Sequence, residues 1–549
     1  MKERNQMRRA RRWRAVGYGS VLAVTAFLLL FRLNAYALWD DEAAQALFAE
    51  QVWQTGDTSA VVGRNIVAYD HGAELENLHD RATPPLTSYL MAPFVGADTI
   101  SALRPRLLPA FCGVLFYGLF LLWLWRASAD ATTQLLFSLA LIGNVALYLF
   151  FRQARYYGVN LVCSQALAYL YFHWTGSRRR LVAISLLMFC LLASHTMTYA
   201  AVAIVLAVDY LFWRRHEHRL RAGDWAWLLL PQALLGTVLL SIWNPFATGR
   251  GDDLFSNTLA QRAELFWWNL RDLNRAELGV GLLLLIAPFL WRPRHKQSIF
   301  LRGPVAIVVY CAVMAMVSPK VIRISPNVAD VRYLLPLVPL CLALGALTLR
   351  ALIGRRTWLA LPLGLVAFGT NLFNFGPLLP EGFRSTFLCY LSELKTPVPG
   401  PYDATVRWID AHTVPGNSIL VLPGYATYPL MYHAPQEIYA WQLSYPPQPQ
   451  FAGLGTIQFF GIEPPDYLIA FGPYIGGISE IIRSGRKLGY YYQQVATIDE
   501  YWVPEHLPAL IDHKFEDYTH FDPRTEAVYV FKRVPTDPRR DRGGLSPSK

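Results

Sequence analysis

Charged residues are scarce in this chain. Asp, Glu, Lys and Arg make up 16% of its 549 residues, whereas hydrophobic residues make up 54% and aromatic residues 14%. So few charges cannot solvate the outside of several water-soluble domains. The composition therefore excludes a wholly soluble protein of this length and predicts one that lies in a lipid bilayer.

The signatures of several other protein classes are also missing. The six cysteines suggest no disulfide framework, because all but Cys389 fall in apolar stretches where they pack or face lipid. There is no glycine-rich nucleotide-binding loop, no paired Cys and His at metal-ligand spacing, and no internal repeat. A net charge of +11 could suggest nucleic acid, but the Lys and Arg form short clusters between apolar stretches. That distribution is typical of the cytoplasmic side of membrane proteins.

Long hydrophobic runs are abundant instead. About eleven apolar stretches approach the length that a helix needs to cross about 30 Å of hydrocarbon. We place them near residues 16–33, 105–125, 132–150, 157–174, 181–194, 197–213, 225–243, 278–291, 304–318, 333–349 and 357–374. The first follows a basic N-terminus, as in a signal peptide, but no convincing small-residue cleavage site follows it. We therefore expect an uncleaved first span.

The positive charges orient these spans. If the N-terminus is cytoplasmic, alternate connections hold most of the cations between spans, as the positive-inside rule requires. Those connections are Arg126, 178–180, 214–221, 292–302 and 350–356. The remaining connections then face the other side, including the first loop at 34–104 and everything after Asn374. This pattern also predicts two helices in 181–213, hinged near Ser194 to Thr196.

The composition changes from about Tyr402 onwards. A helical pattern at 403–412 and a strand pattern at 418–423 are followed by strand-like runs at 466–472 and 527–533, with a proline-rich loop at 444–453. We predict a mainly α polytopic membrane domain at 1–376 and a small extracytoplasmic α/β domain at 377–549.

Three acids follow the first span directly. Asp40, Asp41 and Glu42 open an amphipathic helix at the membrane surface and disfavour one another's ionisation. One interpretation is structural: Asp40 or Asp41 caps free amides, and Glu42 complements the helix dipole. The other is a general base that takes a proton from an acceptor hydroxyl. Both roles can hold at once.

Arginines on the same side are candidate anion ligands. Arg152 and Arg155 lie three residues apart, hence on one helical face, and Arg332 lies at the mouth of the tenth span. Cations there oppose the positive-inside rule, which favours phosphate binding over simple snorkelling. Arg81 precedes the proline pair of the first loop and could pair with a lipid phosphate. Its neighbours His79 and Asp80 are more typical of a rigid elbow.

Two further polar positions have a structural and a functional interpretation. His195 lies in an apolar hairpin, where a satisfied structural histidine is favoured over a ligand or base. Arg262 precedes Trp267 and Trp268 in an amphipathic segment that is typical of a helix lying on the membrane. The alternative is a lid over a lipid substrate in which Arg262 contacts phosphate.

These segments, in this order, resemble the GT-C glycosyltransferases that use polyprenyl-phosphate sugars, including protein O-mannosyltransferases and lipid A aminoarabinose transferases. The resemblance covers residues 40 to about 339. It is carried by Asp41 and Glu42, by Pro84, Pro85 and Leu86, by RLLPA at 106–110, by Arg155 and Tyr157, by Ser194 and His195, and by RYLLPLVP at 332–339.

The resemblance implies that Asp41 is the catalytic base, with Asp40 as the alternative. Members often have Lys or His just before the proline pair, where this chain has Thr83, so Arg81 is the substitute. Some members have a second Asp where this chain has Tyr156. We therefore expect a single carboxylate, inversion at the anomeric carbon, no nucleotide-sugar site, and metal-independent chemistry without a cofactor.

The expected reaction transfers a sugar, hexose or pentose, from a polyprenyl-phosphate donor to a hydroxyl of a glycolipid, a polysaccharide or a protein. We expect it at a bacterial inner (plasma) membrane, on the extracytoplasmic side. A transporter is the main rival, but repeated halves and matched broken helices are missing from the sequence. A lipid-linked glycan ligase or polymerase is the second alternative.

Overall fold

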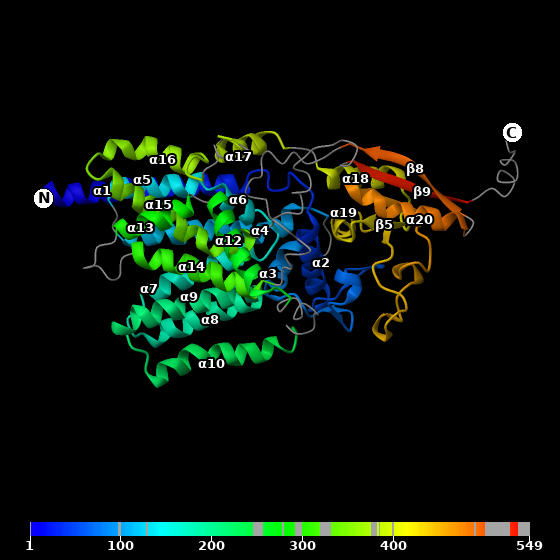
Figure 1. The fold of residues 1–549 in the computed structure, drawn as a ribbon, viewed down its shortest axis with the longest axis horizontal. Helices are drawn as coiled ribbons and strands as arrows, with labels where there is room; N and C mark the ends of the chain where they lie inside the picture. Colours follow the sequence, from blue (N-terminus) through cyan, green and yellow to red (C-terminus); the bar gives the residue numbers. More distant parts are fainter. Residues whose placement is uncertain are drawn as a thin grey trace.

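The computed structural model has a helical bundle at one end and a sheet domain at the other (Figure 1). It describes residues 2–96, 100–127, 130–244, 256–276, 279–290, 299–318, 331–374, 382–383, 385–397, 400–487, 490–499 and 527–535. The first loop, with helix α2 (Asp40–Thr55), lies between the bundle and the sheet.

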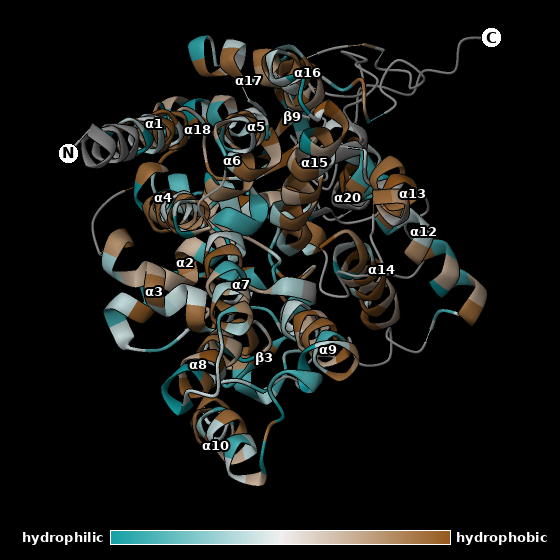
Figure 2. Cartoon of the chain, turned by 90° about the vertical axis from the view of Figure 1, so that its left-hand side faces the viewer, coloured by the Kyte–Doolittle hydropathy of each residue, from teal (hydrophilic) through white to brown (hydrophobic). Residues whose placement is uncertain are grey.

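Each predicted apolar stretch coincides with a helix or a pair of helices. These are α1 (Lys2–Leu30), α4 (Leu103–Arg126), α5 (Ala131–Gly143) with α6 (Val145–Phe151), α7 (Tyr157–Phe172), α8 (Arg178–Ser194), α9 (Thr196–Phe212), α10 (Ala222–Leu239), α13 (Val280–Leu290), α14 (Ile299–Val317), α15 (Val338–Ile353) and α16 (Ala360–Gly369). The helices run side by side, with hydrophobic residues on many outward faces (Figure 2).

Four described helical segments are long and apolar enough to cross a membrane. They lie in α1, in α4, in α14 and in the stretch Arg332–Ile353, and the bent pair α5–α6 makes a fifth. The other apolar helices are shorter or less apolar, so the topology of eleven spans stays a prediction. The exposed leucines of α10, such as Leu229, Leu230 and Leu234, suit a surface that faces lipid.

Two breaks in the helices have local causes. α5 and α6 meet at an angle of 50° at Asn144, whose side chain accepts a hydrogen bond from Leu147 N at 2.9 Å and so starts a new helix. His195 has extended backbone angles (φ −164°, ψ 107°) and separates α8 from α9. The prediction of two hinged helices in this region is confirmed.

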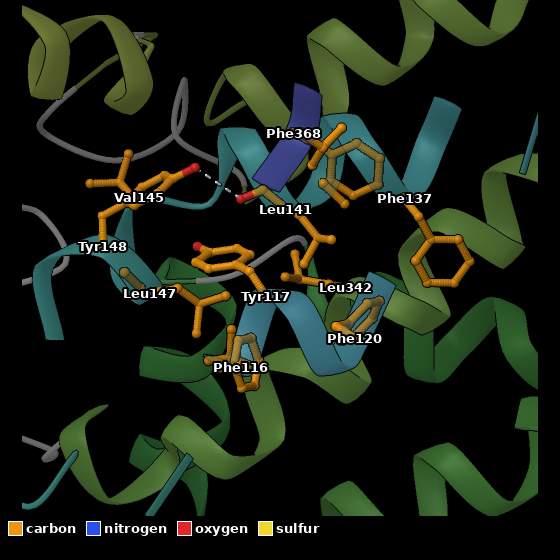
Figure 3. Packing of buried hydrophobic residues seen from close by; sticks show 14 of the residues in the cluster. Phe116, Tyr117, Phe120, Phe137, Leu141, Val145, Leu147, Tyr148, Leu342 and Phe368 are labelled. Atoms are coloured by element: carbon orange, nitrogen blue, oxygen red, sulfur yellow. Dashed lines mark hydrogen bonds between the residues drawn. The ribbon is translucent and has the colours of Figure 1, made fainter. Parts of the chain in front are cut away.

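Aromatic side chains form the centre of the largest core (Figure 3). Tyr148 stacks on Tyr117, with ring centroids 5.8 Å apart, and its hydroxyl donates to Leu141 O at 3.4 Å. Tyr148 also stacks on Tyr390 of α17 (Thr386–Lys395). The hydroxyl of Tyr390 donates to Leu28 O of α1. The segment that leaves the bundle is thus held against it.

The C-terminal domain contains a five-stranded sheet in the order β6 (Ile438–Tyr439), β5 (Ser418–Leu422), β7 (Tyr467–Phe471), β9 (Val528–Pro535), β8 (Tyr490–Ile498). β5 pairs in parallel with β6 and β7, whereas β9 pairs antiparallel with β7 and β8. Helices α18 (Pro401–His412), α19 (Thr427–His433) and α20 (Ile475–Lys487) complete it. The predicted helix and all three predicted strands are confirmed.

The first loop packs against this sheet domain and shares one hydrophobic core with it. Besides α2 it contains short antiparallel pairs, β1 (Val61–Val62) with β2 (Asn65–Ile66) and β3 (Leu75–Glu76) with β4 (His79–Asp80), before α3 (Leu86–Val95). The shared core joins α2 residues such as Leu47 to Ile419 of β5 and Leu430 of α19. The first loop and the C-terminal domain therefore form one structural unit.

Asn65 connects the two parts directly. Its buried side chain donates to Glu437 O at 2.9 Å and accepts from Tyr439 N at 2.7 Å, so it pairs with the edge strand β6 as a backbone would. At the same interface, the exposed Arg64 donates to Gln436 O. The hydrogen bonds of Asn65 are buried, whereas that of Arg64 is exposed to water.

We expect Asn65→Ala to loosen this interface, because it leaves two buried backbone groups without partners, at about 1–3 kcal/mol each. Limited proteolysis of the purified protein in detergent should then cleave the first loop and the C-terminal domain faster than in wild type. Arg64→Ala is the control and should change little, since water can replace its bond. Equal proteolysis of wild type and Asn65→Ala would contradict the interpretation.

Candidate functional site

Asp41 lies at the centre of a charged cluster. Its Oδ2 is 3.2 Å from Arg155 Nη2 and 3.3 Å from Arg332 Nη1, and the hydroxyl of Tyr69 is 3.5 Å from its Oδ1. Arg155 Nη1 also donates to the backbone oxygen of Asp41 at 3.1 Å. The side chain of Asp41 is 21% exposed, so a substrate can reach this carboxylate.

Three segments far apart in the sequence bring these groups together. Asp41 lies in the first turn of α2, Arg155 lies between α6 and α7, and Arg332 lies in the 3₁₀ helix η3 (Val331–Leu337) before α15. Each arginine also lies over the ring of the next residue, Arg155 over Tyr156 at 5.4 Å and Arg332 over Tyr333 at 5.0 Å. Cation–π contact and the ion pair with Asp41 together restrict both guanidinium groups.

The cluster carries more positive than negative charge. Burial opposes the charge of Arg155, but Asp41 and the nearby tyrosines outweigh this effect and raise the pKa of Arg155. Burial and the charge of Asp41 raise the pKa of Tyr69 well above its usual value, so its hydroxyl stays a donor. Two cations facing one accessible carboxylate leave a net positive charge, which favours the binding of a further anion.

Glu42 lies beside Asp41 but is fully buried. Its carboxylate accepts from Arg106 Nε at 2.9 Å and Nη2 at 2.6 Å, from Trp39 N at 3.3 Å and from Ala154 N at 2.6 Å. With four donors and no exposure, Glu42 has the environment of a structural anion. It also joins the start of α2 to the residue before Arg155.

Asp40 is buried as well, and its Oδ1 accepts from the backbone N of Asp41 at 2.6 Å. α2 begins at Asp40, with Trp39 as the N-cap residue, so neither Asp40 nor Asp41 occupies the N-cap position itself. The capping contact that reaches back to Trp39 N comes from Glu42. Of the three acids, Asp41 is the accessible one.

Three predicted phosphate ligands make other contacts. Arg81 forms a bidentate pair with Asp57, at 2.8 and 2.7 Å, which lowers the pKa of Asp57. Arg152 donates to four backbone oxygens at the end of α1, those of Leu28, Leu29, Phe31 and Arg32. A guanidinium there satisfies carbonyls that have no partner within the helix.

Arg262, like Arg152, contacts the end of a helix. It lies in α12 (Leu259–Ala276) and donates to Ala315 O and Ser318 O at the end of α14. In the same amphipathic helix Trp267 is exposed, whereas Trp268 is buried. The segment 245–255 before this helix lies outside the described residues. The role of α12 on the membrane or as a lid stays a prediction.

His195 and Tyr157 border the cluster. The imidazole of His195 stacks between the rings of Tyr156 and Tyr333, at centroid distances of 4.3 and 5.2 Å. Burial, Arg332 and Arg155 lower the pKa of His195 to about 3. Tyr157 begins α7, is buried, and packs edge-on against Phe150 and Tyr156.

Neither Tyr69 nor Arg106 was predicted from the sequence as a residue of this site. Arg106 begins the RLLPA motif, and its cation within an apolar stretch was the signal for a buried ion pair. Tyr69 stacks against Tyr428 of α19, with ring centroids 4.7 Å apart. No local pattern links Tyr69 to Asp41 or to Tyr428.

The described residues hold no group of three or more His, Cys, Asp and Glu that could bind a metal ion. Segments such as 319–330, next to Arg332, lie outside that set. Metal-independent chemistry therefore stays a prediction.

Comparisons with known proteins bear on the fold. No protein-family model matches the sequence, and no curated protein matches it. The crystal structure of ArnT from Cupriavidus metallidurans in the apo state is similar with a TM-score of 0.51 and 14% identity, over 95% of this chain and 98% of that one. The structure of the same protein bound to undecaprenyl phosphate gives 0.49 and 13%, over 94% and 98%. Over nearly its whole length, this chain has the fold of ArnT.

We expect Arg106→Ala to destabilise the protein strongly, because it leaves the buried Glu42 without its countercharge. Removing one partner of a buried pair costs about 3–5 kcal/mol. The apparent melting temperature in detergent, followed by tryptophan fluorescence, should fall by several degrees. The neighbouring Arg104→Ala is the control, because Arg104 reaches a single backbone oxygen, that of Val95. If both variants melt alike, the Glu42–Arg106 pair does not have this role.

Proposed function

We propose that this protein is an inverting glycosyltransferase that moves a sugar from a polyprenyl-phosphate donor to a hydroxyl acceptor on the extracytoplasmic side of the membrane. The observation that carries the proposal is the accessible Asp41 held between Arg155 and Arg332. The fold of ArnT, a lipid A aminoarabinose transferase, supports it.

Asp41 is the proposed general base. The acceptor hydroxyl gives its proton to the Asp41 carboxylate while its oxygen attacks the anomeric carbon. The bond from that carbon to the phosphate oxygen breaks, and the polyprenyl phosphate leaves with the electron pair. Attack from the face opposite the phosphate inverts the anomeric configuration.

Arg155 and Arg332 stabilise the leaving group in this proposal. A lipid phosphate is a good leaving group, so it needs its charge neutralised but needs no proton donor. In the free protein the two arginines pair with Asp41, and a bound phosphate would share them. That sharing weakens their hold on the carboxylate and makes Asp41 a better base when the donor is present.

The remaining assignments follow from topology and from the resemblance. The donor is a polyprenyl-phosphate hexose or pentose, and the acceptor is a hydroxyl of a glycolipid, a polysaccharide or a protein. We place the reaction at a bacterial inner membrane, with the N-terminus cytoplasmic and the C-terminal domain extracytoplasmic. That domain packs on the first loop beside Asp41, where it can contact the acceptor.

We expect Asp41→Asn to reduce transfer by about 10²–10⁴-fold, the usual contribution of a general base. The assay measures sugar transfer from synthetic polyprenyl-phosphate sugars to an envelope extract by the purified protein. The substitution keeps the size of the side chain, so an unchanged melting temperature controls for folding. Full activity of Asp41→Asn would show that Asp41 is not the general base.

Arg155 and Arg152 offer a matched pair. Arg155→Ala should raise the KM for the donor and lower kcat, roughly 10²-fold in kcat/KM, because it removes a cation from the phosphate site. Arg152→Ala should lower the melting temperature but leave kcat/KM within about twofold, since Arg152 caps α1. The same loss of kcat/KM in both folded variants would contradict the assignment of Arg155 to the phosphate site and of Arg152 to the end of α1.

A further inference from the structure

The hydrogen bonds of His195 determine which of its nitrogens carries the proton. The backbone N of Thr198 lies 3.2 Å from His195 Nδ1, and a backbone amide can only donate. Nδ1 must therefore accept, which places the single imidazole proton on Nε2. The hydroxyl of Thr198 lies 2.8 Å from Nδ1 and accepts from Asn160 Nδ2.

The faces of the imidazole are both covered. Tyr156 and Tyr333 stack on it at interplanar angles of 7° and 13°. These tyrosines directly follow Arg155 and Arg332, so the segments that bring the two arginines to Asp41 also clamp His195. The ring can therefore interact with a ligand only through its edge.

The Nε2 edge has no hydrogen-bond partner among the described residues, whereas the Nδ1 edge is bonded to Thr198. Arg155 Nε is also buried and has no hydrogen-bond partner among the residues that the structure describes. Two N–H groups beside the pair of arginines are thus left for a ligand. Burying an N–H group without a partner is unfavourable, so a ligand oxygen that accepts a hydrogen bond from Arg155 Nε gains affinity.

We propose that neutral His195 donates its Nε2–H to an oxygen of the donor's phosphate, which makes it a phosphate-contacting residue beside Arg155 and Arg332. This inference rests on the proposed function. A neutral donor adds a directed hydrogen bond without a third positive charge, so it orients the phosphate while leaving the product free to dissociate. The histidine is then more than the N-cap of α9.

Three substitutions separate this role from a structural one. His195→Gln places an amide N–H near the position of Nε2 but loses the stacking ring. His195→Phe keeps a ring between Tyr156 and Tyr333 but has no N–H. His195→Asn keeps a good cap for α9 but is too short to reach the Nε2 position. The probe is a synthetic polyprenyl monophosphate, titrated into the purified full-length protein in detergent.

We expect His195→Gln to bind the probe within about threefold of wild type, and His195→Phe and His195→Asn to bind at least roughly tenfold more weakly, as for the loss of one hydrogen bond to a charged group. Tight binding by a folded His195→Phe or His195→Asn, with weak binding by His195→Gln, would overturn the inference and leave the proposed function intact. If wild type itself does not bind the probe, the proposed function fails as well.

Discussion

The geometry of the site depends on one buried carboxylate, that of Glu42. It accepts hydrogen bonds from the start of its own helix, from Arg106 of α4 and from the backbone of Ala154. These contacts hold α2, the bundle and the loop that carries Arg155 in one arrangement. Asp41 directly precedes Glu42, and Arg155 directly follows Ala154. The hydrogen bonds of the buried Glu42 therefore determine the distance between Asp41 and Arg155 more than their own ion pair does.

Four of the arginines that were predicted to bind phosphate divide into two groups by what they contact. Arg152 and Arg262 donate to backbone oxygens at helix ends, where cations complement the helix dipole. Arg155 and Arg332 contact the Asp41 carboxylate and stack on tyrosines that in turn enclose His195. The first group stabilises helix ends, and the second leaves cations and N–H donors facing an accessible carboxylate. The proposed phosphate site consists of the second group.

Much of the fold could be predicted from local sequence, because a long apolar run indicates a membrane helix and a strand-like alternation indicates a strand without knowledge of distant residues. The hinge at His195, the helices of the bundle and three strands of the C-terminal domain, β5, β7 and β9, are examples. Arg155 and Arg332 were predicted as anion ligands from the placement of charge, whereas the choice of Asp41 among the three acids came from the resemblance. Contacts such as Asn65 with β6, or Tyr69 with Tyr428, join positions more than 350 residues apart and leave no local pattern. Arg81 looked equivalent to Arg155 in sequence because nothing nearby revealed its partner Asp57.

In the proposed reaction, an acceptor oxygen that Asp41 activates displaces the lipid phosphate directly. The most direct test is the anomeric configuration of the product, measured by nuclear magnetic resonance after transfer from a synthetic polyprenyl-phosphate sugar of known configuration. Direct displacement yields an inverted product, with one polyprenyl phosphate released for each sugar transferred. A product that retains the configuration of the donor, or the absence of transfer from any such donor, would contradict it.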